Sequence, residues 1–444
     1  MSRRPAFTSI ELASGSRAAR APAPAAGQAP SRWVAVLCAA SVVLGAFSTP
    51  ALAGDWPQIL GPHRNGRADG ETLQAWKESG PKRLWSRNVG MGYAGAVVQG
   101  NRTIVFHRVG GDEIVECWNV ATGEPIWKTT YPAAYRGGVN ADLGPRCTPI
   151  IHKDKVIVYG AAGDLHVLQL SDGAKLWTKE TWNDYDAPDG YFGAGSSPLV
   201  ADNKVLINVG GSRAAIVALS LADGQEAWTA LDDQASYSSP TLAKINGQLR
   251  AVFVTRMKAA VLDPQNGEIK YQATFGARGP TVNAATPLVV DNQLFLSAAY
   301  GVGARLVDLS AEPKVVWQND DSMSSQYTTC VTVGGILYGS SGREDFRNGD
   351  LRCVDWKSGK VLWSEKKTGV AHVILAGQHL LVSTIDGRIL LLRTNPKRYE
   401  QLAEARVVDG LNRVLPALAN GRLLLRKSSG ERSQMICLQV GKTN

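Results

Sequence analysis

A hairpin motif that ends in tryptophan recurs along most of this chain, and it constrains the fold more than any other feature. The motif joins an apolar run, a polar turn and a second run with an aromatic end, as in CVDWKSGKVLW at 353–363. Its aromatic ends fall at Trp85, Trp127, Trp177, Trp228, Tyr271, Trp317 and Trp363. Because these positions are 42 to 51 residues apart, the chain is a tandem repeat.

A second motif alternates with the first. It is an apolar stretch, a polar turn and a β-branched or leucine-rich run, as in PIIHKDKVIVYG at 149–160, and its copies begin at residues 96, 149, 198, 240, 287, 330, 373 and 416. Each copy of either motif has the alternation of two strands joined by a turn. Four antiparallel strands repeated eight times predict an all-β, eight-bladed β-propeller over residues 82–440.

The two ends of the repeat region predict how the ring closes. QMICLQV at 434–440 is a third strand without a fourth, and KRLWSRNV at 82–89 is a fourth strand without the preceding three. We expect these segments to pair, so that the N-terminal strand completes the C-terminal blade and removes two open sheet edges. The seventh copy, at 390–407, lacks the tryptophan-ended turn.

The recurring tryptophans are expected to dock neighbouring blades. A large flat ring on an outer strand can pack between blades while its N–H reaches a backbone carbonyl. We assign this structural role to six residues: Trp85, Trp127, Trp177, Trp228, Trp317 and Trp363. The glycines of the intervening turns suit tight hairpins that require a positive φ.

Residues 1–53 are predicted to be a signal peptide with a long basic region. An apolar run at 33–47 follows Arg32, and Ala51-Leu52-Ala53 forms a small-x-small cleavage site; an uncleaved anchor is the alternative. We therefore expect a periplasmic or secreted protein that does not span the membrane after cleavage. Residues 54–81 form a lead-in segment and 441–444 a tail.

Charge and short motifs exclude several function classes. Residues 1–53 contain five arginines and one glutamate, so the formal net charge of +9 falls to +5 without them, and no basic face for nucleic acid is indicated. The six histidines show no metal-binding spacing, and there is no G-x-S-x-G elbow or phosphate loop. We predict no catalytic residue and no metal ligand from motifs. The five cysteines outside residues 1–53 have no C-x-x-C spacing and are expected to be buried.

The ending [LV]-x-[DSN]-x-x-[TSDN]-G-x-x-x-W resembles the repeat of the pyrroloquinoline-quinone (PQQ) propellers, and DWPQILGPHRNG at 55–66 is similar to the start of exported members. That superfamily includes quinoprotein alcohol dehydrogenases and the propeller lipoprotein of the outer-membrane barrel-assembly machinery. The dehydrogenase branch implies PQQ, a Ca²⁺ ion held by Glu, Asn and Asp, and often a vicinal disulfide. This chain has no adjacent cysteines and no assignable calcium ligands, and it has no lipoprotein cysteine after the apolar run.

The resemblance implies an exported, non-catalytic propeller that acts as a protein-binding or assembly scaffold in the bacterial envelope, with no cofactor expected. The alternative is a PQQ- and Ca²⁺-dependent dehydrogenase of alcohols or sugars. A carbohydrate or small-anion binding module is a third reading. The expected partner is an envelope protein or a small polar ligand.

The candidate contact surface is the face that carries the long loops. In a propeller, the loops that lead into each blade's first strand and those that join its second and third strands lie on one face, which we call the loop face. Residues three before each first-strand anchor should ring the central channel. We assign the ligand or partner face to these ring positions, their neighbours and the long loops: Tyr93, Arg146, Tyr237, Asn283, Tyr327, His372, Arg413, Tyr135, Arg136, Asp184, Tyr185, Asp186, Arg278, Arg343 and Asp345.

Overall fold

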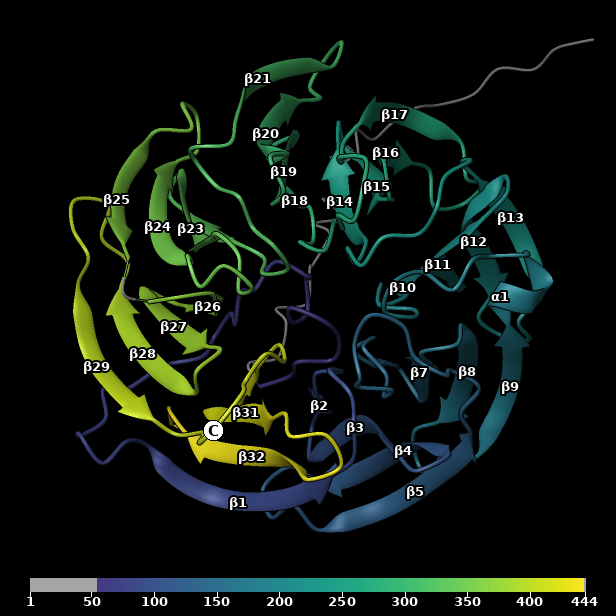
Figure 1. The fold of residues 1–444 in the computed structure, drawn as a ribbon, viewed down its shortest axis with the longest axis horizontal. Coiled ribbons are helices and arrows are strands. Elements are labelled where there is room, and N and C mark those ends of the chain that lie inside the picture. Colours follow the sequence, from purple (N-terminus) through teal and green to yellow (C-terminus); the bar gives the residue numbers. More distant parts are fainter. Residues whose placement is uncertain (1–53, 367, 443–444) are drawn as a thin grey trace, which may run out of the picture. The chain divides into compact units, whose positions relative to one another are not determined.

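Eight four-stranded antiparallel sheets make up the fold, which confirms the predicted eight-bladed propeller. The structure is a computed structural model that describes residues 54–366 and 368–442, so the predicted signal peptide lies outside the described residues. The sheets succeed one another around a central axis, with the first strand of each blade innermost and the fourth outermost (Figure 1). In the described part of the chain, no helix has the length and apolarity needed to cross a membrane.

The first four blades follow one another in chain order. Blade 1 contains β2 (Val97–Gln99), β3 (Arg102–Val109), β4 (Asp112–Asn119) and β5 (Pro125–Pro132). Blade 2 contains β6 (Ile150–His152), β7 (Lys155–Tyr159), β8 (Asp164–Gln169) and β9 (Lys175–Glu180). Blade 3 contains β10 (Leu199–Ala201), β11 (Lys204–Gly211), β12 (Ala214–Ser220) and β13 (Glu226–Ala230). Blade 4 contains β14 (Thr241–Ile245), β15 (Gln248–Val254), β16 (Lys258–Leu262) and β17 (Ile269–Thr274).

The next three blades repeat this order, and the last blade takes its outer strand from the other end of the repeat region. Blade 5 contains β18 (Leu288–Val290), β19 (Gln293–Ala298), β20 (Gly303–Asp308) and β21 (Lys314–Asn319). Blade 6 contains β22 (Val331–Val333), β23 (Ile336–Ser341), β24 (Asp350–Asp355) and β25 (Val361–Glu365). Blade 7 contains β26 (Ala371–Ala376), β27 (His379–Thr384), β28 (Arg388–Arg393) and β29 (Gln401–Arg406). Blade 8 contains β30 (Ala417–Ala419), β31 (Arg422–Lys427), β32 (Ser433–Gln439) and β1 (Lys82–Val89).

Blade 8 closes the ring as the sequence predicts. Strand β1 pairs antiparallel with β32 from Lys82 opposite Gln439 to Val89 opposite Ser433. A register shift between Arg83 and Trp85 interrupts this ladder. Because the outermost strand of blade 8 comes from the start of the repeat region, the two ends of that region are joined by backbone hydrogen bonds within one blade.

Each recurring tryptophan reaches from the outer strand of one blade to the outer hairpin of the next. The indole N–H of Trp127 donates to the Leu170 carbonyl at 2.9 Å, and its ring covers the turn glycine Gly173. The same indole-to-carbonyl bond joins five further pairs: Trp85 to Val120, Trp177 to Leu221, Trp228 to Pro264, Trp317 to Trp356 and Trp363 to Asn395. A Cβ on Gly173 would lie 2.5 Å from the Trp127 ring, so this contact requires glycine in the turn as well as a positive φ.

The lead-in segment crosses the face opposite the loop face. Asp55 accepts a hydrogen bond from Gly100 in the inner hairpin of blade 1, and Glu71 accepts from Asn420 and Gly421 in the corresponding hairpin of blade 8. Between these two contacts, Ala68 donates to the Leu375 carbonyl on the inner strand of blade 7. The segment therefore ties several inner strands together from one side.

Arg64 fills the space between inner strands at the centre of the lead-in. Its side chain is buried, and its guanidinium donates to the backbone carbonyls of Pro198 and of Pro240, the latter at 2.8 Å. Gln58 accepts from its Nε at 2.7 Å. Burial lowers the pKa of Arg64 to about 9, so the group remains charged at neutral pH and pairs with carbonyl dipoles instead of a carboxylate.

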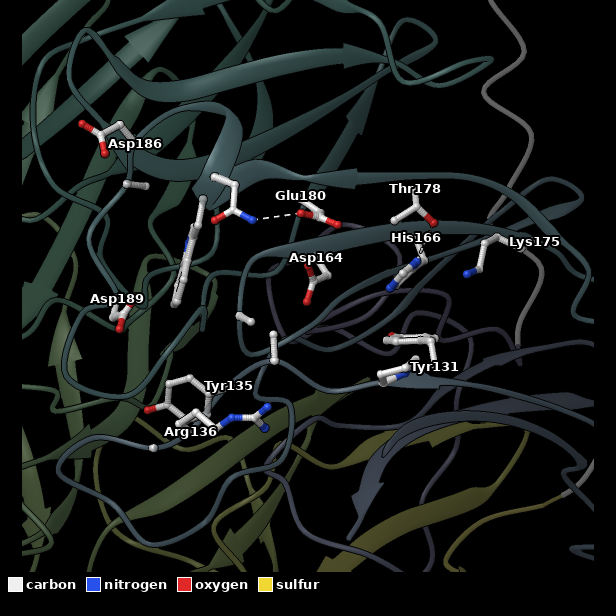
Figure 2. Close-up of a pocket in the computed structure, with 17 residues that line it drawn as sticks. Tyr131, Tyr135, Arg136, Asp164, His166, Lys175, Thr178, Glu180, Asp186 and Asp189 are labelled. Atoms are coloured by element: carbon white, nitrogen blue, oxygen red, sulfur yellow. Dashed lines mark hydrogen bonds between the residues drawn. The ribbon is translucent and has the colours of Figure 1, made fainter. Parts of the chain in front are cut away.

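The long loop between blades 2 and 3 departs from the purely β expectation. It begins with the one-turn helix α1 (Thr181–Asp184) and continues over the outer part of the loop face. Together with the end of β5 and the outer strands of blade 2 it encloses a pocket (Figure 2).

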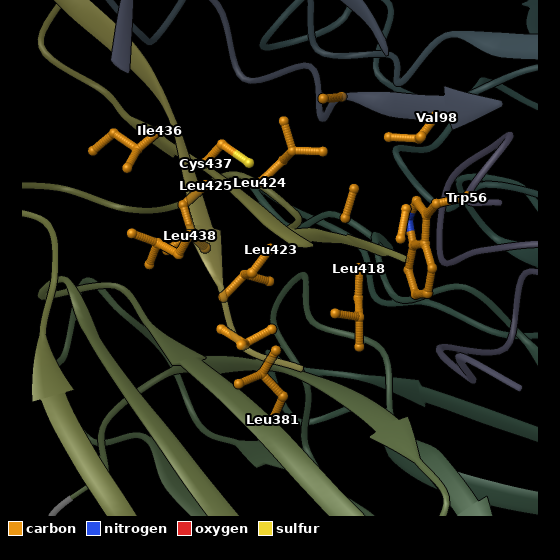
Figure 3. Packing of buried hydrophobic residues seen from close by; sticks show 14 of the residues in the cluster. Trp56, Val98, Leu381, Leu418, Leu423, Leu424, Leu425, Ile436, Cys437 and Leu438 are labelled. Carbon is orange, nitrogen blue, oxygen red and sulfur yellow. The ribbon is translucent and has the colours of Figure 1, made fainter. Parts of the chain in front are cut away.

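Apolar side chains of the lead-in and of blades 7, 8 and 1 form one continuous core. Figure 3 shows Trp56 beside Leu418, with Leu423 and Leu381 completing the contact towards blade 7. Cys437 belongs to the same cluster and is fully buried. All five described cysteines are buried and free, which agrees with their expected role as small apolar residues.

Candidate functional site

An ion pair between loops of blades 6 and 8 organises the inner part of the loop face. Arg413 precedes blade 8, and its Nε donates to Glu344 Oε2 at 2.8 Å while its Nη2 lies 2.5 Å from Oε1. The Tyr327 hydroxyl donates to the same Oε2 at 2.6 Å. Burial, followed by the charge of Glu344, raises the pKa of Tyr327, so the phenol remains protonated and is a permanent donor.

Two arginines share the ring of Tyr93. The guanidinium carbon of Arg413 lies 5.3 Å from the centroid of that ring, and the guanidinium carbon of Arg146 lies 6.0 Å from it. Arg146 also lies 5.3 Å from the centroid of Tyr135. These contacts continue the polar chain from blade 8 into blades 1 and 2. We call the six residues the mouth cluster: Tyr93, Tyr135, Arg146, Tyr327, Glu344 and Arg413.

His372 lies beneath the mouth cluster and is buried. Its Nε2 is 2.8 Å from the Arg413 carbonyl, which can only accept, so Nε2 carries the proton. Burial lowers the pKa of His372 to about 4, and the ring is neutral at neutral pH. The Tyr327 ring packs against it at 5.9 Å between centroids. The histidine thus supports the loop that presents Arg413 rather than facing solvent.

The predicted ring position Tyr237 and Asn283, predicted beside the ring, are not members of the mouth cluster. Tyr237 packs against Gly195 and Phe192, and its hydroxyl accepts from the Phe192 backbone N–H at 2.8 Å. Asn283 is buried, and its amide donates to the carbonyls of Thr255 and Phe275 at 3.0 and 3.1 Å. Its side chain fixes the blade 4 to blade 5 loop and is directed into the protein, which differs from the expected surface contact.

The remaining predicted residues are spread over the outer loops. Arg343 and Asp345 pair with each other, and Arg343 stacks at 4.3 Å on both Tyr300 and Phe346. Tyr185 donates to Glu226 at 2.8 Å, and Asp184 pairs with Lys179. Three others are exposed on their loops: Arg136, Asp186 and Arg278.

Glu344, which joins the mouth cluster, was not among the residues predicted from the sequence. It lies between Arg343 and Asp345, both of which were predicted, but these neighbours turn outwards while Glu344 reaches Arg413. The 341–349 loop has no repeat register, so no periodic signal shows which of three successive charged residues points inwards. Arg64 lies within the DWPQILGPHRNG segment at 55–66, but no local sequence pattern predicts that its side chain is buried.

Apolar side chains stand exposed around the mouth cluster. Val139 and Phe346 are 73% and 64% exposed, the two highest values among the large exposed hydrophobic residues of the described chain, and Tyr191 is 40% exposed. Val139 and Tyr191 are held together by a backbone hydrogen bond of 3.1 Å. Arginine, tyrosine and exposed apolar groups on one face have the composition of protein–protein contact surfaces.

The amino-acid sequence of this chain matches the model of a known family over most of its length. The family model described as outer membrane protein assembly factor BamB matches residues 68–190 and 111–365. A relative with that name from Salmonella typhimurium is 24% identical over 332 residues, which cover 70% of this chain and 78% of the relative.

Solved structures share the fold at low identity. BamB from Moraxella catarrhalis aligns with a TM-score of 0.60 and 16% identity, over 80% of this chain and 97% of that one. The quinohemoprotein alcohol dehydrogenase from Comamonas testosteroni aligns with a TM-score of 0.63 and 15% identity, over 88% and 81% of the two chains. Since enzymes and non-enzymes share this fold, the sequence match decides the family. The chain belongs to the family described as outer membrane protein assembly factor BamB.

Proposed function

We propose that this protein is a non-catalytic scaffold of the bacterial envelope that binds partner proteins of outer-membrane protein assembly through its loop face. The observation that carries the proposal is the mouth cluster with its exposed apolar surround. Its charges are already paired and positioned by the fold, so little ordering is needed when a partner docks. Exposed Phe346, stacked with Arg343, provides an aromatic anchor beside the cluster.

The position of the lead-in segment also supports the loop face as the surface that binds partner proteins. Because residues 55–73 occupy inner hairpins and inner strands on the opposite side, a partner approaching the central axis meets open loops only on the loop face. Membership of the BamB family supports assembly as the process and the envelope as the compartment. The predicted signal peptide agrees with that location.

The dehydrogenase alternative does not fit the residues at the mouth. A bound Ca²⁺ requires carboxylate oxygens that are free to coordinate it. Both oxygens of Glu344 are engaged by Arg413 and Tyr327, and both oxygens of Asp142 accept backbone N–H groups of Gly92 and Gly144. Both carboxylates are therefore engaged in holding loops and are not free to coordinate Ca²⁺.

Site-specific photocrosslinking in cells tests the proposal. A photoreactive residue at Phe346 is expected to crosslink to a component of the outer-membrane assembly machinery. The matched control is Leu249, which is 38% exposed in the inner hairpin of blade 4 on the opposite face. Crosslinks from Leu249 and none from Phe346 would contradict the assigned face. In a strain that lacks the native gene, Arg146→Ala with Arg413→Ala should reduce β-barrel protein levels in the outer membrane, and full complementation would argue against the mouth cluster.

A further inference from the structure

A pocket lies between blades 1 and 2, beside the mouth cluster, and Tyr135 of that cluster forms part of its wall. It has a volume of about 740 Å³, within the range of small-molecule sites. Its walls come from the end of β5, the outer strands β8 and β9 of blade 2, and the loop that begins with α1. Of the mouth cluster only Tyr135 lines this space, and the proposed scaffold role assigns no ligand to it.

Two carboxylates face each other across the strands of blade 2 in this pocket. Asp164 on β8 is directly opposite Glu180 on β9. Like charges at directly opposite positions destabilise a sheet unless a counter-charge is present. Burial, and then the charge of Glu180, raises the pKa of Asp164. Within the part of the chain that the structure describes, Asp164 has no ion pair, and Glu180 accepts only from the Asn183 amide.

The lining as a whole is anionic. Asp186 and Asp189 lie on the side of the pocket opposite Tyr131 and His166 (Figure 2). Four carboxylates therefore line the space against two cations, Arg136 and Lys175. Neither cation comes within ion-pair distance of these carboxylates among the described residues.

The floor of the pocket contains polar groups that lack partners. Tyr131 and His166 are 5% and 4% exposed, and their rings lie 3.8 Å apart between centroids. His166 Nδ1 is 2.8 Å from the Thr178 hydroxyl, while its Nε2 and the Tyr131 hydroxyl have no hydrogen-bond partner among the described residues. A buried polar atom without a partner costs about 1–3 kcal/mol, so these atoms indicate a site that is completed by a bound group.

The geometry points to this pocket as a binding site for an organic ammonium ion, a polyamine or a lysine side chain, held by Asp164 and Glu180 against the rings of Tyr131 and Trp182. Carboxylates are the strongest acceptors for an N⁺–H donor, and aromatic faces attract organic cations. Among the described residues no group of three or more His, Cys, Asp or Glu side chains could hold a metal ion, so an organic cation fits these residues better than a metal.

The two pairs of acids favour an extended ligand with two charges. One ammonium group fits between Asp164 and Glu180, and a second reaches Asp186 and Asp189 on the far side. A neutral sugar would find hydrogen bonds here but would leave the opposed carboxylates uncompensated.

Isothermal titration calorimetry of the full chain in about 0.15 M salt tests this inference, because surface charges are largely screened there. The probes are spermidine, an acetylated tri-lysine amide, Ca²⁺ and N-acetylglucosamine. We expect saturable binding of at least one amine, weakened tenfold or more by Asp164→Asn combined with Glu180→Gln. Tighter binding of spermidine identifies a small polyamine as the ligand type, and tighter binding of the peptide identifies a basic protein segment.

The matched control is Glu312→Gln, an exposed carboxylate in the outer hairpin of blade 5. It should leave amine affinity unchanged. Equal weakening by the control, no saturable amine binding, or saturation by Ca²⁺ or the sugar alone would overturn the inference. Neutralising both opposed carboxylates removes their repulsion and should preserve or raise the Tm, so lost binding in the stable double variant reports the site rather than unfolding. The crosslinking experiment at Phe346 tests the proposed scaffold function, and its outcome does not depend on whether the pocket binds amines.

Discussion

The guanidinium of Arg413 holds the carboxylate of Glu344 through two hydrogen bonds, although the two residues are 69 positions apart and belong to blades 8 and 6. The pair links the loop of blade 6 to the segment that leads into blade 8, and it joins Tyr327 and Tyr93 in one polar network. Both side chains are largely shielded from water, with 30% and 17% of their side-chain surfaces exposed. The acidic partners of the outer-loop pairs are more exposed, at 42% for Asp184 and 52% for Asp345.

Arg413→Ala is expected to lower the free energy of unfolding by about 1–3 kcal/mol, because it leaves Glu344 partly buried with only the Tyr327 hydroxyl. Urea denaturation measures the loss. Arg87→Ala is the control, since Arg87 pairs with a highly exposed Glu124 and should change stability by less than about 1 kcal/mol. If both variants lose the same amount, the mouth pair is no stronger than a surface pair.

The contact between turn glycines and tryptophans of the neighbouring blade gives a second prediction. Gly173 and Gly247 both have φ near +75°, but a Cβ at Gly173 would meet Trp127 at 2.5 Å, whereas a Cβ at Gly247 meets nothing within 4 Å. Gly247→Ala should cost about 1–2 kcal/mol from backbone strain alone. Gly173→Ala should cost about 1–3 kcal/mol more because the indole must move. Thermal unfolding of the two variants separates these effects, and equal losses would rule out a packing role for the ring.

Glu113 makes stability depend on pH. Its Oε1 accepts from the Ala161 N–H of blade 2 at 3.0 Å, and burial raises its pKa to about 7 from an ordinary value of 4.5. Between pH 4.5 and about 7, the Glu113 carboxyl is protonated in the folded protein and ionised in the unfolded chain. The free energy of unfolding therefore decreases as the pH rises from 4.5 to about 7. The decrease amounts to about 3 kcal/mol at most.

Glu113→Gln removes this dependence while keeping an acceptor for the N–H. Relative to the unchanged protein, the variant should therefore gain more stability at pH 8 than at pH 5, as measured by urea denaturation at both values. Glu312→Gln, on the exposed hairpin, should show the same difference from the unchanged protein at both pH values. A Glu113→Gln effect that does not vary with pH would mean that the carboxylate is charged throughout.

Arg64 provides the fourth prediction. Arg64→Met keeps the length of the side chain but leaves the Pro198 and Pro240 carbonyls and the Gln58 amide without their donor. We expect a loss of about 2–4 kcal/mol in the free energy of unfolding. Arg67→Met changes a neighbouring arginine whose side chain is 37% exposed, and should cost less than about 1 kcal/mol. Equal losses of unfolding free energy in the two variants would show that the buried Arg64 guanidinium stabilises the fold no more than the exposed Arg67 does.

The repeat made the architecture readable from the sequence, because strand alternation recurs in every blade, turn glycines recur in blades 1 to 4 and 6, and these local signals agree with the global fold. The same register located four members of the mouth cluster: Tyr93, Arg146, Tyr327 and Arg413. His372 was predicted beside the ring and not from the register itself; it lies in β26, which begins at Ala371, and its side chain is buried. The repeat register could not predict the positions of Glu344 and Arg64. Glu344 lies in an irregular loop, and Arg64 lies in the lead-in segment outside the repeat.

The pocket between blades 1 and 2 was hidden for a related reason. Asp164 and Glu180 stand at opposite ends of an outer hairpin, and only the pairing of β8 with β9 brings them together. Tyr131 reaches the pocket from the preceding blade. Such a site appears only when the contact between two repeats is known, whereas a repeat pattern describes each unit separately.

The pairing of β1 with β32 has a consequence for how the protein is made. Strand β1 emerges early during synthesis, yet its partner is among the last segments to leave the ribosome, so its hydrogen-bonding edge stays open until then. A chain that stops short of β32 would expose unpaired edges on both β1 and β31 and invite association with other chains. Completion of the ring therefore serves as a check of length: only a molecule translated through residue 439 can cover the edges of β1 and β31 that face β32.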